Sequence, residues 1–178
     1  MRVISGKARG TKLATIEGNN TRPTTDRVKE SLFNLIQFDI IDAVVVDFFA
    51  GSGALGIEAA SRGAKEVTLV ENYRKCHEAI EYNLERTGLE NVKLLKADVL
   101  SSFTRLEKAD VILMDPPYSQ DFILPVLKKI ADHGILNEDG KIVIEHSKDD
   151  ALPVSYEGFV RSKQKKYGIA VISIYVYE

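Results

Sequence analysis

Short apolar runs alternate with segments of helical periodicity through the middle of this chain. The apolar runs predict five strands, at about 43–48, 66–71, 92–96, 109–114 and 141–145. The segments between them predict helices at about 54–62, 73–87 and 121–132, with one short turn near 101–105. Such alternation is typical of a parallel sheet that is covered by helices on both faces.

The end of the chain has a different pattern. Residues 158–165 and 169–177 both resemble strands, and they are joined tightly through Tyr167-Gly168. Two strands with so short a connection form an antiparallel hairpin. We therefore predict an α/β fold, in which a seven-stranded, mostly parallel sheet finishes with a C-terminal antiparallel hairpin.

The start of the chain also departs from the alternation. Residues 2–5 and 11–14 predict a small β-hairpin. After a polar stretch at 17–21, a helix is expected to begin near Thr24 or Thr25, because its apolar residues then share one face. These apolar residues are Val28, Leu32, Leu35 and Ile36.

Length and composition favour a single soluble domain over 1–178, with residues 1–40 as an appendage to a core of 41–178. A single cysteine, Cys76, cannot form an internal disulfide and suits the reducing cytoplasm. The three histidines lack metal-ligand spacing, so we predict no metal site. Neither a signal peptide nor a membrane-spanning run is recognised, so no membrane partner is expected.

A glycine-rich loop follows the first predicted strand. Asp47 lies near the end of that strand, just before the glycines, and Gly51, Gly53 and Gly56 then satisfy the pattern G-x-G-x-x-G. Glycines let the backbone turn tightly and approach a ligand closely. Glu71 ends the next apolar run, where a carboxylate can accept hydrogen bonds from ribose hydroxyls. These features are compatible both with NAD and with S-adenosylmethionine.

The fourth predicted strand leads into Asp115-Pro116-Pro117-Tyr118. Two successive prolines make a stiff loop whose carbonyls point in fixed directions. The Asp115 carboxylate and the Pro116 carbonyl can accept both hydrogens of one exocyclic amine, while Tyr118 offers a ring for stacking. Since ligands bind at the carboxyl ends of parallel strands, we predict that this loop holds a flat, amine-bearing ring. A proline turn that only starts a helix is the alternative.

Two carboxylates favour S-adenosylmethionine over NAD. Asp47 would repel a bound pyrophosphate but suits a cationic ligand that carries an amine. Asp98 follows the third strand and can accept a hydrogen bond from an adenine amine. Hydride transfer, in addition, has no need of an Asp-Pro-Pro-Tyr loop. A nicotinamide-dependent oxidoreductase stays the alternative, and a comparison of NADH with S-adenosylmethionine binding would separate the two.

The net charge of −2 conceals an uneven distribution. Residues 1–30 carry seven Lys/Arg against three Asp/Glu, and residues 158–178 carry four against one, whereas 31–157 carry thirteen against twenty-two. Basic ends are often solvated surface, but beside a loop that holds a base they favour contacts with phosphates. The predicted RNA-binding residues are Lys7, Arg9, Arg22 and Arg27.

The chain resembles the bacterial 16S ribosomal RNA guanine-N2 methyltransferases over nearly its whole length. The matching segments are 2–13, 22–34, 47–56 and 115–118. Many amino-directed methyltransferases of DNA, RNA and protein share the Asp-Pro-Pro-Tyr loop, whereas the segment that begins Arg22-Pro23-Thr24 narrows the resemblance to this family.

The resemblance implies a Rossmann-like class I methyltransferase fold and S-adenosylmethionine as cofactor. It also implies methylation of the exocyclic N2 of one guanine in 16S rRNA, within the small ribosomal subunit or its assembly intermediate. The implied catalytic residues are Asp115, Pro116, Pro117 and Tyr118. The implied cofactor-binding residues are Asp47, Ala50, Gly51, Gly53, Glu71, Asn72, Asp98 and Val99.

Two further alternatives are open at this point. The chain can be another amino-directed nucleic-acid methyltransferase, such as one that acts on adenine N6. It can also be a non-catalytic RNA-binding assembly factor, although the intact Asp-Pro-Pro-Tyr loop argues against that. We expect a monomer in the cytoplasm.

Overall fold

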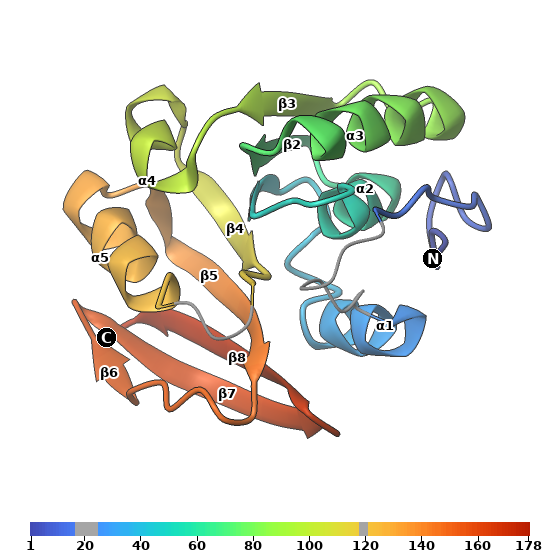
Figure 1. Ribbon diagram of the computed structural model, residues 1–178. Coiled ribbons are helices and arrows are strands. Elements are labelled where there is room, and N and C mark those ends of the chain that lie inside the picture. The colour runs from blue at the N-terminus through green and yellow to red at the C-terminus, as the bar shows by residue number, and fades with distance from the viewer. Residues whose placement is uncertain (17–24, 118–120) are drawn as a thin grey trace.

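One sheet runs through the molecule, with helices on both faces (Figure 1). This computed structural model describes residues 1–16, 25–117 and 121–178. The described strands form the order β3-β2-β1-β4-β5-β8-β7-β6. The parallel strands are β1 (Val44–Phe48), β2 (Glu66–Glu71), β3 (Val92–Lys96), β4 (Ala109–Met114) and β5 (Leu136–Ser147).

The C-terminal strands are antiparallel, as predicted. They are β6 (Ser155–Tyr156), β7 (Phe159–Tyr167) and β8 (Ala170–Tyr177). Gly168, at φ +64°, opens the two-residue turn between β7 and β8. The mostly parallel α/β fold with its terminal hairpin is confirmed, but the count of seven strands was wrong. The described residues contain eight, because the two-residue β6 is too short to produce a periodic pattern.

Strand β5 begins earlier than the sequence predicted. Leu136 pairs with Ala109 of β4, but the next paired residue on β5 is Lys141, which is opposite Val111. The residues between them bulge out of the sheet. A side chain at Gly140 would lie 2.6 Å from the Leu136 side chain, so glycine fits this irregularity. The segment before residue 141, which the sequence did not predict as part of a strand, is therefore a bulge within β5.

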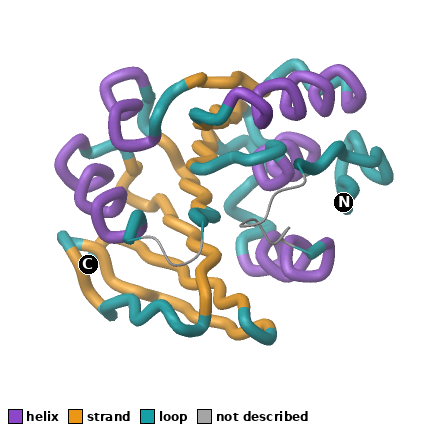
Figure 2. The backbone as a smooth tube through the Cα atoms, in the orientation of Figure 1, coloured by secondary structure: helices purple, strands orange, loops and turns teal. Residues whose placement is uncertain are grey.

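The helices divide between the two faces of the sheet, and Figure 2 shows the strands as a layer between them. Their bounds are α1 (Asp26–Leu35), α2 (Ala54–Ser61), α3 (Arg74–Thr87), α4 (Val99–Ser102), the 3₁₀ helix η1 (Phe103–Arg105) and α5 (Ile123–His133). Helices α1, α2 and α3 pack on one face, and α4, η1 and α5 pack on the other. Each face of the sheet therefore has its own apolar core: the first core lies under α1, α2 and α3, and the second under α4, η1 and α5. Val45 of β1 faces the first core, and its neighbour Val46 faces the second.

Helix α1 begins where its apolar pattern indicated. The Thr25 hydroxyl accepts a hydrogen bond from the Val28 backbone N–H, and Asp26 lies in the first turn. Leu32 and Ile36 are buried in the core. The N-terminal hairpin, in contrast, is smaller than predicted. Its two arms make a single antiparallel bridge, Arg2 to Lys12, within a turn held by a few backbone hydrogen bonds.

Buried polar groups, rather than a β-ladder, fasten the N-terminal segment to α2. The fully buried Glu58 carboxylate accepts hydrogen bonds from the Ile4 and Ser5 backbone N–H groups, at 2.8 and 3.0 Å. It also pairs with buried Lys29 of α1 at 3.3 Å and with Arg62 at 2.7 Å. Burial lowers the pKa of Lys29, while Glu58 opposes that shift. Residues 1–16, α1 and α2 are therefore joined through one carboxylate.

Among the residues that the structure describes, no helix has the length and apolar composition needed to cross a membrane.

Candidate active site

The carboxyl ends of the parallel strands bring most of the predicted site residues to one edge of the sheet. Strand β1 lies between β2 and β4, so the loop after Asp47 is flanked by Glu71 on one side and Asp115 on the other. The charges of both neighbours act on the Asp47 carboxyl group. Three acidic groups that are distant in sequence therefore share one site.

Asp47 is the buried carboxyl group at the centre of this edge. Only 1% of the residue is exposed. One oxygen, Oδ2, accepts a hydrogen bond from the Gly56 N–H at 2.9 Å, whereas Oδ1 has no partner among the described residues. Burial raises the pKa of Asp47 to about 8, and the charges of Asp115 and Glu71 add to the rise. Buried acceptors without a donor are rare, so this one fits a ligand that brings a cationic donor.

Glycines shape the loop between β1 and α2. Gly51 and Gly53 have φ values of +57° and +81°, which other residues adopt only with strain. A Cβ at Gly53 would lie 3.1 Å from the Leu69 side chain, and one at Gly56 would lie only 2.2 Å from it. The glycines at 53 and 56 therefore let α2 pack closely on β2. Gly51 and the preceding Ala50 form the turn at the strand tip, where the Ala50 N–H donates to the Val70 carbonyl.

Glu71 is held in place by backbone donors on both sides. The Gly51 N–H donates to Oε2 at 2.8 Å, and the Asn72 and Tyr73 N–H groups each donate to Oε1 at 2.9 Å. Each carboxylate oxygen can accept more than one hydrogen bond. The carboxylate is thus fixed before any ligand arrives and retains lone pairs for a pair of hydroxyl groups.

Asp98 and Val99 lie at the start of α4, two strands from Asp47. Asp98 is exposed, and its Oδ1 accepts a hydrogen bond from the Leu100 N–H at 2.9 Å, so the side chain caps the helix. Val99 is buried in the second core. The capping hydrogen bond occupies one carboxylate oxygen of Asp98. The contact of Asp98 and Val99 with adenine stays a prediction.

The predicted catalytic loop continues directly from β4. Asp115 and Pro117 are half-buried, and Pro116 is buried. This loop is adjacent to the glycine loop because β4 pairs with β1 up to Met114 and Phe48. Tyr118 of the predicted site, like Arg22, lies outside the described residues.

Comparisons with known proteins show the family of this chain. A family model described as Conserved hypothetical protein 95 matches residues 1–176. The chain belongs to this family. A relative from Escherichia coli strain K12, Ribosomal RNA small subunit methyltransferase D, is 32% identical over 176 residues, which cover 98% of this chain and 89% of that protein.

Two further similarities extend the comparison. YlbH, an rRNA methyltransferase candidate of Bacillus subtilis, is 36% identical over 180 residues, or 98% of each chain. The structure of the Escherichia coli methyltransferase candidate yhhF has a TM-score of 0.88 at 32% identity, and covers 100% of this chain and 98% of that one. The resemblance recognised from the sequence, the Rossmann-like fold and the assignment as an enzyme of the methyltransferase class are confirmed.

Asn83 of α3 is a member of this site that the sequence did not reveal. The side chain is fully buried. Its amide nitrogen donates to the Ser52 carbonyl in the glycine loop at 2.9 Å and to the Ala14 carbonyl at 3.1 Å, and its oxygen accepts from the Ala14 N–H at 2.7 Å. Asn83 therefore holds the glycine loop and the N-terminal segment together. Its only signal in the sequence is a polar residue near the apolar face formed by Ile80 and Leu84.

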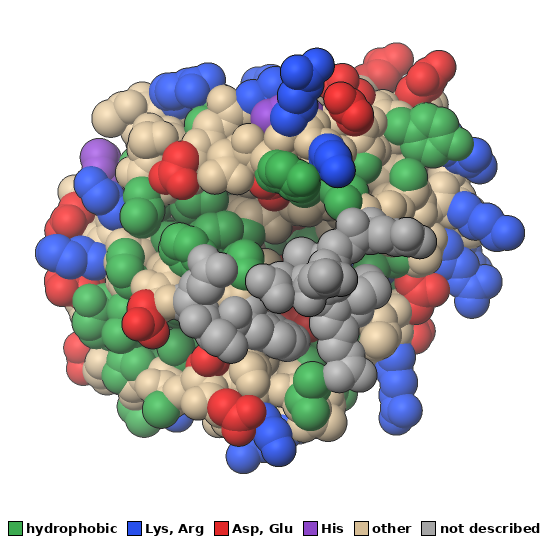
Figure 3. Space-filling model, viewed as in Figure 1, with side chains coloured by type: hydrophobic (Ala, Val, Ile, Leu, Met, Phe, Trp, Pro, Cys, Tyr) green, Lys and Arg blue, Asp and Glu red, His purple; other side chains and the backbone are tan. Residues whose placement is uncertain are grey.

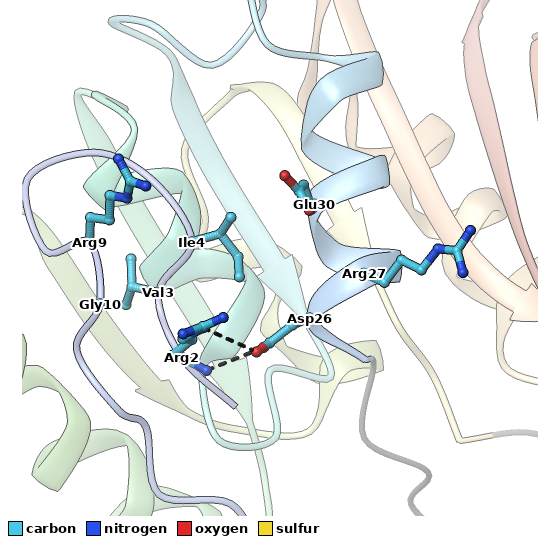
Figure 4. Close-up of a pocket in the computed structure, with 8 residues that line it drawn as sticks. All are labelled: Arg2, Val3, Ile4, Arg9, Gly10, Asp26, Arg27 and Glu30. Atoms are coloured by element: carbon cyan, nitrogen blue, oxygen red, sulfur yellow. Dashed lines mark hydrogen bonds and ion pairs between the residues drawn. The ribbon is translucent and has the colours of Figure 1, made fainter.

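The predicted RNA-binding residues Arg9 and Arg27 line one pocket of about 340 Å³, between the N-terminal segment and α1 (Figure 4). Arg2 lies there too and pairs with Asp26 at 3.7 Å. Lys7 is exposed in the adjoining turn. Figure 3 shows Lys and Arg side chains along this margin, over the N-terminal segment and α1. The structure thus gathers basic groups from both parts of the appendage.

Proposed function

We propose that this protein transfers a methyl group from S-adenosylmethionine to the exocyclic N2 amine of one guanine in 16S rRNA. The observation that carries the proposal is the arrangement at the sheet edge. A buried carboxyl group with an unpartnered oxygen and a preorganised carboxylate lie under the glycine loop, next to the Asp115-Pro116-Pro117 turn. The rRNA methyltransferase named among the relatives supports the same substrate.

The residues present fit S-adenosylmethionine. Glu71 would accept hydrogen bonds from the ribose hydroxyls, with Asn72 next to it, and Asp47 would accept from the ammonium group. Ala50, Gly51 and Gly53 would bring the backbone close to the methionine and ribose. Asp98 and the Val99 N–H would bind adenine. When bound, the cofactor supplies an electrophilic methyl group on a positively charged sulfur.

The acceptor amine needs electrostatic help rather than a strong base. The N2 lone pair of guanine is delocalised into the ring and is a poor nucleophile. Hydrogen bonds from the amine to the Asp115 carboxylate and the Pro116 carbonyl favour a pyramidal nitrogen and stabilise the positive charge that develops on it. The stiff Pro116-Pro117 loop holds these acceptors in position, which lowers the entropic cost of alignment. A paired base cannot reach such a loop, so the guanine must be flipped out or already unpaired.

The basic appendage would bind the RNA around the target base. Arg9 and Arg27 in the shared pocket, together with Lys7, offer cationic groups on the exposed margin, and Arg22 is included in the proposal from the sequence. Contacts of this kind position the RNA backbone without reading its sequence.

Labelled-methyl transfer to small-subunit rRNA from cells that lack this protein tests the proposal. Nucleoside analysis of the product is expected to give N2-methylguanosine. Asp115→Ala should abolish transfer and leave cofactor affinity within a few-fold, whereas Asp139→Ala, which changes an exposed acid in the β5 bulge, should leave both transfer and cofactor affinity unchanged. Label in N6-methyladenosine would identify an adenine enzyme. RNA binding without transfer would indicate an assembly factor, and NADH binding an oxidoreductase.

A further inference from the structure

Strand β7 carries exposed basic side chains that the proposed active site does not use. Lys163, Lys165 and Lys166 are exposed, and the sequence has no Asp or Glu from residue 158 to residue 177. Among the described residues, no ion pair involves any of these three lysines, although lysines elsewhere, such as Lys93 and Lys128, have acidic partners. This strand is therefore a positive surface on a protein whose net charge is −2.

The sheet topology directs the end of β7 toward the active-site edge. Strand β8 is antiparallel to β5, and β7 is antiparallel to β8, so β7 runs in the same direction as the parallel strands (Figure 1). The C-terminal half of β7, which contains the lysines, consequently lies at the edge that holds Asp47, Glu71 and Asp115.

The strand register aligns one lysine with the catalytic loop. Lys165 is opposite Ile172 of β8, and Ile172 is opposite Glu145 of β5. The residue before Glu145 is in turn opposite Met114, which immediately precedes Asp115. With neighbouring strands about 4.8 Å apart, three steps place the Lys165 backbone roughly 14 Å from that of Asp115. One RNA strand of a few nucleotides can extend over that distance and so contact both positions.

A bulge in β7 determines the face of the sheet from which Lys163 and Lys165 project. Arg161 is opposite Tyr175, on the face covered by α5, but the register shifts before Lys163, which is opposite Ile174 on the face covered by α1. Lys163 and Lys165 therefore share a face with α1, which contributes Arg27 to the basic pocket. Bulges commonly redirect side chains in this way next to functional sites.

We propose that Lys163 and Lys165 bind the phosphates of the RNA strand next to the target guanine, an inference that rests on the proposed function. Alternate residues of a strand project on one side about 7 Å apart, so the two ammonium groups form a row along the backbone of an extended RNA segment. The strand is also accessible, because β6 pairs only with Phe159 and Val160.

Edge protection is the competing explanation. Lysines and bulges on an open edge strand prevent pairing with another sheet, and they do so without any RNA. Protection requires charge of either sign, whereas phosphate binding requires positive charge. A charge reversal therefore separates the two explanations: it keeps the edge charged and soluble but repels RNA.

The test compares Lys163→Glu/Lys165→Glu with Lys65→Glu/Lys108→Glu. Lys65 and Lys108 are exposed residues directly before β2 and β4, at the opposite edge of the sheet. Binding to unmethylated small-subunit rRNA is measured over a range of salt concentrations, and S-adenosylmethionine binding is measured by calorimetry. The Lys163→Glu/Lys165→Glu variant should bind RNA about tenfold more weakly at low salt, and its cofactor affinity should be unchanged. The slope of log RNA affinity against log salt concentration should fall by about two.

The control variant Lys65→Glu/Lys108→Glu should change RNA affinity and its salt slope much less. Lys163→Arg/Lys165→Arg should retain wild-type RNA binding. Equal losses in the two Glu pairs, with methyl transfer by the wild type intact, would overturn the inference and leave the proposed function standing. A wild-type protein that neither binds nor methylates rRNA would instead refute the proposed function itself, and this inference with it.

Discussion

The buried carboxyl group of Asp47 leads to a prediction about stability and pH. Its pKa is about 8 in the folded protein, against an ordinary value of 3.8. Between these values the folded state keeps a proton that the unfolded state has lost. Stability therefore falls as pH rises, by about 1.4 kcal/mol per pH unit for this one group. Asp47→Asn has nearly the same shape and can keep the Gly56 hydrogen bond, but it does not titrate.

The magnitude follows from the pH interval. From pH 5 to pH 7, the wild type should lose about 2.7 kcal/mol of unfolding free energy relative to Asp47→Asn. Urea unfolding of both proteins without cofactor, followed by circular dichroism, measures this difference, and the contributions of all other titrating groups cancel. A difference that stays constant over this interval would mean that Asp47 is ionised in the folded protein, and the assignment of a buried protonated acid would be wrong.

Cofactor binding extends the same prediction. An ammonium group beside Asp47 would favour the ionised carboxylate and release its proton. The affinity of the wild type for S-adenosylmethionine should therefore increase with pH up to about 8, while that of Asp47→Asn should be weaker and nearly independent of pH. Calorimetry in buffers of different ionisation enthalpy would detect the released proton. Parallel pH profiles for the two proteins would contradict the placement of a cation at Asp47.

Three other substitutions test the rest of the site. Glu71→Ala should weaken S-adenosylmethionine binding by about 10- to 100-fold, because hydrogen bonds to a charged group are lost, and unchanged affinity in calorimetry would remove Glu71 from the cofactor site. Asn83→Ala leaves partly buried backbone groups of Ser52 and Ala14 without partners, so thermal or urea unfolding should show a loss of about 1–3 kcal/mol together with weaker cofactor binding. Full cofactor affinity in a folded variant would show that Asn83 does not position the loop. Neutralising Arg9 and Arg27 should lower rRNA affinity and reduce its salt slope by about one for each charge, and an unchanged slope would leave them as ordinary surface charges.

The central parallel strands β1 and β4 were predictable because both of their faces are buried. Val44–Phe48 and Ala109–Met114 are nearly continuous apolar runs, and their bounds agree with the prediction to within a residue. Three features were not predictable from periodicity. The bulge before Lys141 resembles a turn, and β6 is too short to alternate. The N-terminal arms make only one bridge to each other and are also held by Glu58 and Ser61 of α2.

The candidate site was predictable wherever its residues follow strands. Asp47, Glu71 and Asp115 each stand at a strand end, and parallel topology brings such ends together. Asn83 could not be found in this way, because its role depends on how α3 packs against two segments that are distant in sequence. The opposing partner of a side chain is a property of tertiary structure, and no local pattern encodes it.

The contacts that Glu58 makes with Lys29, Arg62 and the backbone of residues 4 and 5 have a consequence for truncation of this protein. If residues 1–40 were removed, Glu58 would lose Lys29 and two backbone donors at once. The apolar surface that Leu32, Phe33 and Ile36 cover would also be exposed to water. A fragment of residues 41–178 is therefore a poor candidate for independent expression, even though it contains the whole parallel sheet. The segment that carries the basic pocket is also part of what keeps the methyltransferase core folded.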